Sequence, residues 1–126
     1  MSGRHEKEIM FENRIIEKLK GAPLIVTEYY YSLIGAGKTY ATTYNYINYI
    51  MSFINFTFEN DCPEDFYLTV KPVHINKYIA SLRTKTTKGK VEKTSDSIKT
   101  VHWSALNSFF TFVIFIIFPP FIKIIF

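Results

Sequence analysis

The chain has 126 residues and a formal net charge of +4, and 48% of its residues are hydrophobic and 17% aromatic. This length predicts one domain with a single core, and the apolar content excludes an intrinsically disordered chain. The one cysteine, Cys62, excludes an internal disulfide framework and indicates a reducing compartment, so we expect a cytoplasmic protein. The polar N-terminus around Arg4 and Glu6 does not predict a signal peptide.

Hydrophobic spacing predicts three helices in the first half of the chain. The first covers residues 6–20 and ends before Pro23. The second covers about residues 24–34, although its apolar and tyrosine residues would also suit a buried strand. The third runs from Thr39, a good N-cap, to about Phe56, because an apolar stripe repeats at helical spacing along it.

The second half begins with an acidic turn at residues 59–65 and continues with a fourth helix. Pro72 suits the first turn of this helix, where its missing amide has no hydrogen bond to lose. A basic loop that contains glycine is expected from Thr84 to Lys93. The last helix is predicted from Ser95 to Phe112 and is taken as the central helix of the domain. Its buried face is expected to contain Ile98, Val101, Ala105, Phe109 and Phe112.

These segments together predict an all-α fold, a small bundle of four to five helices. We expect residues 1–21 to be an N-terminal extension with a short helix. Residues 22–114 are expected to form the helical domain, and residues 115–126 an atypical apolar tail.

The segment Gly35–Thr39 resembles half of a phosphate-binding loop. Such a loop reads G-x-x-x-x-G-K-[ST], and Gly37, Lys38 and Thr39 fit its second half. The first required glycine is Ser32, and the loop also needs a preceding strand within a parallel sheet. We therefore expect a loop that ends one helix and caps the next, and no nucleotide cofactor.

The residues offer no metal site and no catalytic group. The three histidines, His5, His74 and His102, have only Cys62 as a further ligand, whereas structural zinc needs four ligands in paired spacings. No nucleophile has a credible base beside it, and the acidic residues gather in the turn at 59–65. The sequence therefore offers no candidate for a metal ligand set or for a catalytic residue.

Two groups of lysines and hydroxyls stand at predicted helix starts, where free amides and the helix dipole favour an anion. The first consists of Lys38, Thr39, Thr42 and Thr43. The second is the segment from Arg83 to Lys99, which has six basic residues against Glu92 and Asp96. If both groups face the same way, they form a phosphate clamp.

Three motifs in order resemble one known family. The first is Thr39, Thr42, Tyr46, Ile50 and Phe53, which matches Ser/Thr-x-x-Thr-x-x-x-Tyr-x-x-x-Leu-x-x-Phe. The second is residues 73–82, with an apolar-x-x-Tyr-apolar-x-x-Leu pattern, and the third is Ser97-Ile98 followed by Ser104-Ala105-Leu106 and Phe109-Phe110. Over about residues 15–112 the chain resembles the N-terminal core-binding (SAM-like) domain of tyrosine recombinases, the phage-integrase family.

The resemblance implies an orthogonal bundle of two crossed helical hairpins that clamps double-stranded DNA at a recombination site. By position, the implied DNA-binding residues are Lys38, Thr39, Thr42, Thr43, Lys85, Lys88, Lys90, Lys93, Thr94, Ser95, Ser97 and Lys99. Other recombinase protomers on the DNA are a further class of partner. The catalytic domain of the family is absent from this sequence, so the expected role in DNA integration or recombination is binding without cleavage.

The end of the chain departs from the family. After Phe112 the family continues with a polar turn, whereas this chain continues with an apolar run that includes Pro119-Pro120. A truncated or frameshifted gene would explain it. The stretch from Phe109 to Phe118 is shorter than the roughly 20 residues of a membrane span, which argues against a membrane partner. The alternative function is a small membrane-associated or partner-binding helical protein anchored by its apolar C-terminal tail.

Overall fold

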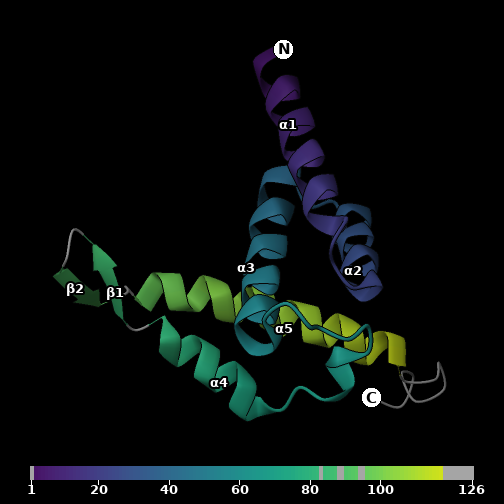
Figure 1. The fold of residues 1–126 in the computed structure, drawn as a ribbon. Coiled ribbons are helices and arrows are strands. Elements are labelled where there is room, and N and C mark those ends of the chain that lie inside the picture. Colours follow the sequence, from purple (N-terminus) through teal and green to yellow (C-terminus); the bar gives the residue numbers. More distant parts are fainter. Residues whose placement is uncertain (1, 83, 88–89, 94–95, 118–126) are drawn as a thin grey trace. The chain divides into compact units, whose positions relative to one another are not determined.

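The structure, a computed structural model, describes residues 2–82, 84–87, 90–93 and 96–117. Side chains are not described for residues 2–4, 84–87, 90–93 and 96–97. The described residues form five α-helices and two short strands, which confirms the predicted all-α class (Figure 1). The chain divides into two compact units, an N-terminal unit, Met1–Asp65, and a C-terminal unit, Phe66–Phe126, and each is described by itself.

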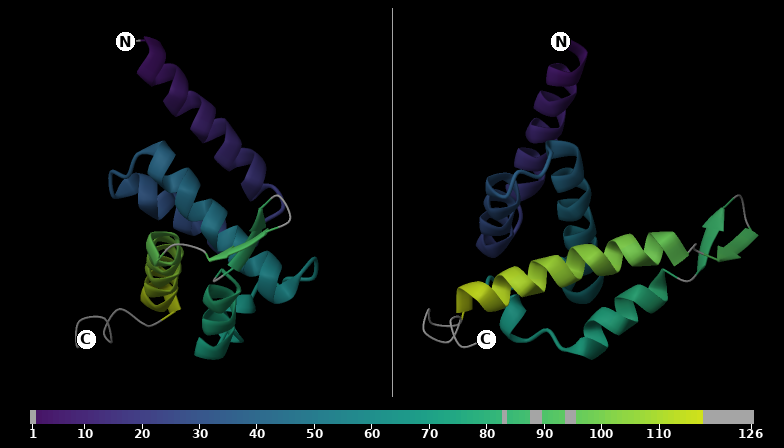
Figure 2. Two further views of the ribbon diagram at one scale, coloured as in Figure 1. Left: turned by 90° about the vertical axis from the view of Figure 1, so that its left-hand side faces the viewer. Right: turned by 180° about the vertical axis from the view of Figure 1, so that it is seen from behind.

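The N-terminal unit consists of three helices, α1 (Ser2–Leu19), α2 (Leu24–Gly35) and α3 (Tyr40–Phe58). Helix α3 packs against both α1 and α2, as the two views in Figure 2 show. The second segment is a helix, so the strand alternative is wrong. The fully buried large apolar side chains of this unit are Ile15, Val26, Tyr29, Ile47, Ile50, Phe53 and Ile54. Ile9 and Ile16, which lie on α1 with Ile15, are exposed.

The link between α2 and α3 shows why Gly37 is needed. Its φ of 87° lies in the left-handed region, which glycine adopts without steric cost. The amides of Gly37 and Lys38 donate to the carbonyls of Ile34 and Leu33, both at 3.0 Å, which is the Schellman pattern that ends a helix. Thr39 then caps α3 as predicted, because its Oγ1 accepts from the Thr42 amide at 3.2 Å.

The C-terminal unit begins with a 3₁₀ turn, Phe66–Leu68, that the sequence analysis did not predict. Helix α4 (Pro72–Ser81) follows, with Pro72 at its start as predicted. Helix α5 (Asp96–Ile117) has 22 residues and packs against α4. The Phe66 and Phe109 rings stack nearly parallel, with centroids 6.0 Å apart and planes 2° apart, so the 3₁₀ turn also contributes to this packing.

The basic loop is the main correction to the predicted fold. The strands β1 (Thr84–Thr87) and β2 (Lys90–Lys93) pair antiparallel as a hairpin, and in its backbone register Lys85 lies opposite Glu92 and Thr84 opposite Lys93. A basic segment can form strands because backbone hydrogen bonds, which do not depend on side-chain type, join the two halves. This short hairpin leaves the all-α fold class unchanged.

The buried face of α5 also differs from the prediction. Ala105, Leu106, Phe109 and Val113 are buried, as the helical spacing requires. Ile98 and Val101, which were expected in the core, are exposed. The helix also continues to Ile117, five residues beyond its predicted end at Phe112. The first and last turns of α5 therefore present apolar side chains to solvent.

Two predictions concern larger divisions of the chain. The predicted limit of the N-terminal extension, after residue 21, falls inside the N-terminal unit, where α1 packs on α3. Helices α2 and α3 pack together in the N-terminal unit, and α4 and α5 pack together in the C-terminal unit. The crossed arrangement of the two predicted helical hairpins and the division at residues 21 and 114 stay predictions.

Candidate functional site

Charge is divided unequally between the two units. The N-terminal unit has six basic and nine acidic residues, whereas the C-terminal unit has nine basic and two acidic residues. The segment from Arg83 to Lys99 alone has six basic and two acidic residues, so its formal charge equals the +4 of the whole chain. An excess of charge in one part of a chain is typical of proteins that bind polyanions.

The hairpin and the start of α5 hold this excess charge. Lys85 lies in β1, and Lys90 and Lys93 lie in β2, so three of the predicted lysines belong to one short ribbon. Ser97 lies in the first turn of α5, and Lys99 follows it as a half-buried side chain. Lys88, Thr94 and Ser95 lie outside the described residues.

The start of α3 holds the other predicted group. Lys38, Thr39 and Thr42 are exposed there. The hydroxyl of Thr39 lies 3.1 Å from that of Thr42 and accepts from its amide, so both threonines take part in the helix cap. Two polar groups already used in a cap have less capacity for a phosphate.

A carboxylate of the chain itself occupies the helix start. The Tyr40 amide, the first of α3, donates to Oε2 of Glu8 at 3.2 Å, and Glu8 lies on α1. The Leu24 amide at the start of α2 likewise donates to Oε2 of Glu64 at 3.1 Å. The N-termini of α2 and α3 in the N-terminal unit are thus each bound by a carboxylate of the chain itself. At α3, the sequence analysis gave this role to a DNA phosphate.

Thr43 does not belong to an exposed site. Its side chain is 0% exposed, and its Oγ1 has no hydrogen-bond partner among the described residues. A buried hydroxyl cannot contact DNA, so this predicted contact is corrected. The helical period explains the burial, because Thr43 precedes Ile47 by four residues and shares its buried face.

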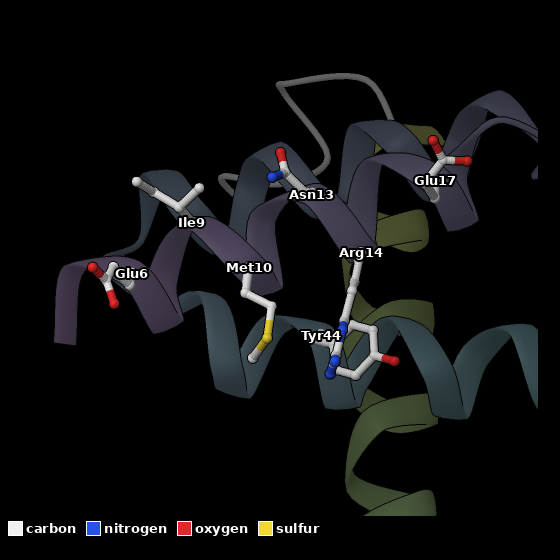
Figure 3. Close-up of a pocket in the computed structure, with 7 residues that line it drawn as sticks. All are labelled: Glu6, Ile9, Met10, Asn13, Arg14, Glu17 and Tyr44. Atoms are coloured by element: carbon white, nitrogen blue, oxygen red, sulfur yellow. The ribbon is translucent and has the colours of Figure 1, made fainter. Parts of the chain in front are cut away.

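A groove of the N-terminal unit lies between α1 and α3. It is open, has a volume of about 620 Å³ and is lined by Glu6, Ile9, Met10, Asn13, Arg14, Glu17 and Tyr44. Figure 3 shows Met10 and Arg14 extending from α1 toward α3. The Arg14 guanidinium lies 6.0 Å from the Phe11 ring, and two carboxylates flank the groove. This lining does not favour an anion.

The remaining candidates for chemistry are the segment Gly35–Thr39, the metal-ligating residue types and Cys62. The segment Gly35–Thr39 follows a helix, and its Gly37 and Lys38 amides are used in the Schellman hydrogen bonds, so it is not a phosphate-binding loop. Among the described residues, no three His, Cys, Asp or Glu side chains are placed to hold a metal ion. Burial and the Glu64 charge raise the pKa of the Cys62 thiol, which disfavours the nucleophilic thiolate.

Helix α5 has a second notable feature. Its residues Ile98–Ile117 are long and apolar enough to cross a membrane, with a mean hydropathy of 1.6 and 28% of the window buried. The sequence analysis counted the apolar run only from Phe109. It therefore did not identify the stretch Ile98–Ile117, because the helix begins before Phe109. Length and composition alone do not distinguish a membrane span from the core helix of a soluble protein.

Comparisons of the chain with protein-family models, with curated proteins and with solved structures find no match. The resemblance to the core-binding domain of tyrosine recombinases therefore depends on the sequence motifs alone.

Proposed function

We propose that this chain binds double-stranded DNA without cleaving it, through the basic segment from Arg83 to Lys99. The observation that carries the proposal is the charge distribution, because this segment holds the whole net positive charge of the chain. Contacts with phosphates supply most of the affinity of such a surface. The resemblance to the core-binding domain adds a recombination site as the class of duplex, and DNA integration or recombination as the process.

The form of the segment supports this proposal. A two-stranded antiparallel ribbon is one of the two elements that the major groove of B-DNA admits. Here β2 ends at Lys93 and α5 begins at Asp96, so only two residues of the sequence separate a lysine-rich ribbon from a helix. Lysines of the ribbon and Lys99 of α5 would contact phosphates, which fix the register of the protein on the duplex.

The start of α3 has a smaller part in the proposal than the sequence predicts. Lys38 is exposed, and its contact with a phosphate stays a prediction. Thr39 and Thr42 serve the cap, and Glu8 places a negative charge at the same helix start. A phosphate at this point would have to compete with that carboxylate.

The experiment is a titration of a labelled duplex with the full chain at about 50 mM and 200 mM salt. We expect affinity to fall steeply with salt. The variant Lys93→Glu with Lys99→Glu should reduce the slope of log affinity against log salt by about two, one for each phosphate that a lysine no longer neutralises. The matched control is Lys7→Glu with Lys18→Glu, two exposed lysines of α1.

Both variants lower the formal net charge from +4 to zero, so the change in total charge is the same and its place in the chain differs. The control should keep a slope close to that of the unmodified chain. Equal reductions in the two variants would show that overall charge, and not this segment, attracts the duplex. Undetectable binding at the lower salt concentration would remove the proposal.

A further inference from the structure

The last turn of α5 is apolar on every side and exposed. Ile114, Phe115, Ile116 and Ile117 are 54%, 62%, 43% and 46% exposed, respectively. Successive residues of an α-helix are about 100° apart, so four in a row cover the whole circumference. Within the window Ile98–Ile117 the only acidic, lysine or arginine residue is Lys99, at the opposite end of the helix.

The distribution of apolar side chains around the whole circumference of the last turn of α5 decides what kind of partner fits. A protein groove covers one stripe of a helix and leaves the other side in water. A helix end that is apolar all round needs an apolar medium on all its sides, and the hydrocarbon of a lipid bilayer is such a medium. The absence of charge in this turn also removes the cost of taking a charge into lipid.

We propose that the last turn of α5, Ile114–Ile117, inserts into the surface of a lipid bilayer and anchors the chain there. Four residues at 1.5 Å each span about 6 Å, which matches the depth of about 5–10 Å at which apolar side chains of interfacial helices lie. The basic hairpin adjoins the other end of α5 (Figure 1), so the anchor and the proposed DNA surface use different ends of one unit.

Contacts within the C-terminal unit keep the rest of α5 outside the bilayer. The Tyr78 hydroxyl of α4 lies 2.8 Å from Nδ1 of His102, and Phe66 stacks on Phe109. A helix that crossed the bilayer would break these interactions and would also place Asn107, which is exposed here, in hydrocarbon. The anchor therefore consists of one turn and not of a membrane span.

The first test is sedimentation of the full chain with vesicles of phosphatidylcholine, which have no net charge. We expect binding that changes little with salt, because an uncharged helix end provides it. Ile114→Asp with Ile117→Asp should reduce the vesicle-bound fraction at least tenfold. The matched control is Ile9→Asp with Ile16→Asp, two exposed isoleucines of α1 at 43% and 46%, which should bind as the unmodified chain does.

Three results would overturn the anchor. The chain could fail to bind neutral vesicles, the two pairs of substitutions could have equal effects, or the chain could form a dimer without lipid that only Ile114→Asp with Ile117→Asp dissociates. The last result would make a second copy the occupant of the helix end. Far-UV circular dichroism of each variant shows whether its helices remain, so loss of binding is not confused with unfolding.

The second test measures depth. Trp103 is the only tryptophan and lies eleven residues, or roughly 16 Å of helix, before Ile114. In the variant Trp103→Phe with Phe115→Trp, lipids brominated on their acyl chains should quench the new tryptophan strongly. The same lipids should leave Trp103 of the unmodified chain almost unquenched. Strong quenching of Trp103 would show a helix that spans the bilayer or lies flat on it, and would contradict this mode of insertion.

The anchor and DNA binding can fail separately. Lys93→Glu with Lys99→Glu should leave binding to neutral vesicles unchanged, and Ile114→Asp with Ile117→Asp should leave duplex binding unchanged. If one substituted pair removed both activities, the two ends of the C-terminal unit would not act independently, and the anchor as proposed would be wrong.

Discussion

The carboxylate of Glu8 accepts a hydrogen bond from the backbone amide of Tyr40, with Oε2 3.2 Å from the nitrogen, and so joins the middle of α1 to the start of α3. The amide is one of four at a helix N-terminus that have no partner within the helix, and the helix dipole favours a negative charge there. The contact therefore fixes the position of α1 on α3 and also occupies the point where an external anion would bind.

Replacing Glu8 with alanine should destabilise the N-terminal unit by about 1–2 kcal/mol, the usual range for a charged partner of a helix start. Urea denaturation followed by circular dichroism, with hydrogen exchange of the α1 and α3 amides, measures this change. The control is Glu6→Ala, because Glu6 lies two residues away on the same helix, is exposed and has the same charge. Equal destabilisation by the two variants would contradict a specific cap.

Replacing Thr43 with valine should leave the free energy of unfolding unchanged or raise it by up to about 1 kcal/mol. The buried hydroxyl has no partner among the described residues, and valine has the same shape without a polar group to desolvate. The same denaturation experiment measures it. Destabilisation above about 1 kcal/mol would reveal a partner for the hydroxyl, and weaker duplex binding by a folded variant would restore Thr43 as a DNA contact.

The parts of the fold that the sequence predicted depend on signals within a few residues. The Thr39 cap and Pro72 at the start of α4 are examples, because each acts on the turn beside it. The hairpin was missed because its strands have four residues each and are almost wholly polar, so they lack the alternation of apolar residues that predicts a strand.

For a related reason, the sequence predicted one part of the candidate site, the basic segment, but not the partners of the helix starts. The basic segment is visible in the sequence because its charges are contiguous. The partners of the helix starts are not visible, since Glu8 and Glu64 are 32 and 40 residues from the amides that they bind. Such contacts depend on how helices pack, and local patterns do not determine that packing.

Acid should weaken the C-terminal unit through His102. Burial lowers the pKa of His102 below its usual value of about 6.5. The unfolded chain then binds this proton more readily than the folded one, so the stability from neutral His102 is complete above pH 6.5 and is lost as pH falls toward the lowered pKa. The Tyr78 hydroxyl lies 2.8 Å from Nδ1 of His102, so the imidazole has a neighbour within the folded unit.

The measurement compares unfolding of the unmodified chain with that of His102→Asn at several pH values between about 7 and 5. Asparagine places a polar group near the position of Nδ1 and does not titrate. We expect the stability difference between the two proteins to shift in favour of the variant as pH falls. A difference that stays constant over this range would show that His102 titrates equally in the folded and unfolded states.

Phe109 should contribute far more to stability than Phe115, although both belong to α5 and are six residues apart. Phe109 is 0% exposed and stacks on Phe66, whereas Phe115 is 62% exposed. Phe109→Ala leaves a cavity in the core, so we expect destabilisation by about 3–5 kcal/mol. Phe115→Ala should change stability by less than about 0.5 kcal/mol.

Thermal and urea unfolding of the two variants test this contrast. The Phe66→Leu variant, which removes the ring that stacks on Phe109, is measured in the same way. Strong destabilisation by Phe115→Ala would mean that the end of α5 is packed in solution and is not free to enter a bilayer. Weak destabilisation by Phe109→Ala would mean that the 3₁₀ turn does not hold Phe66 against α5. The expected pattern separates the buried part of α5, which stabilises the unit, from its exposed last turn, which is proposed to enter the bilayer.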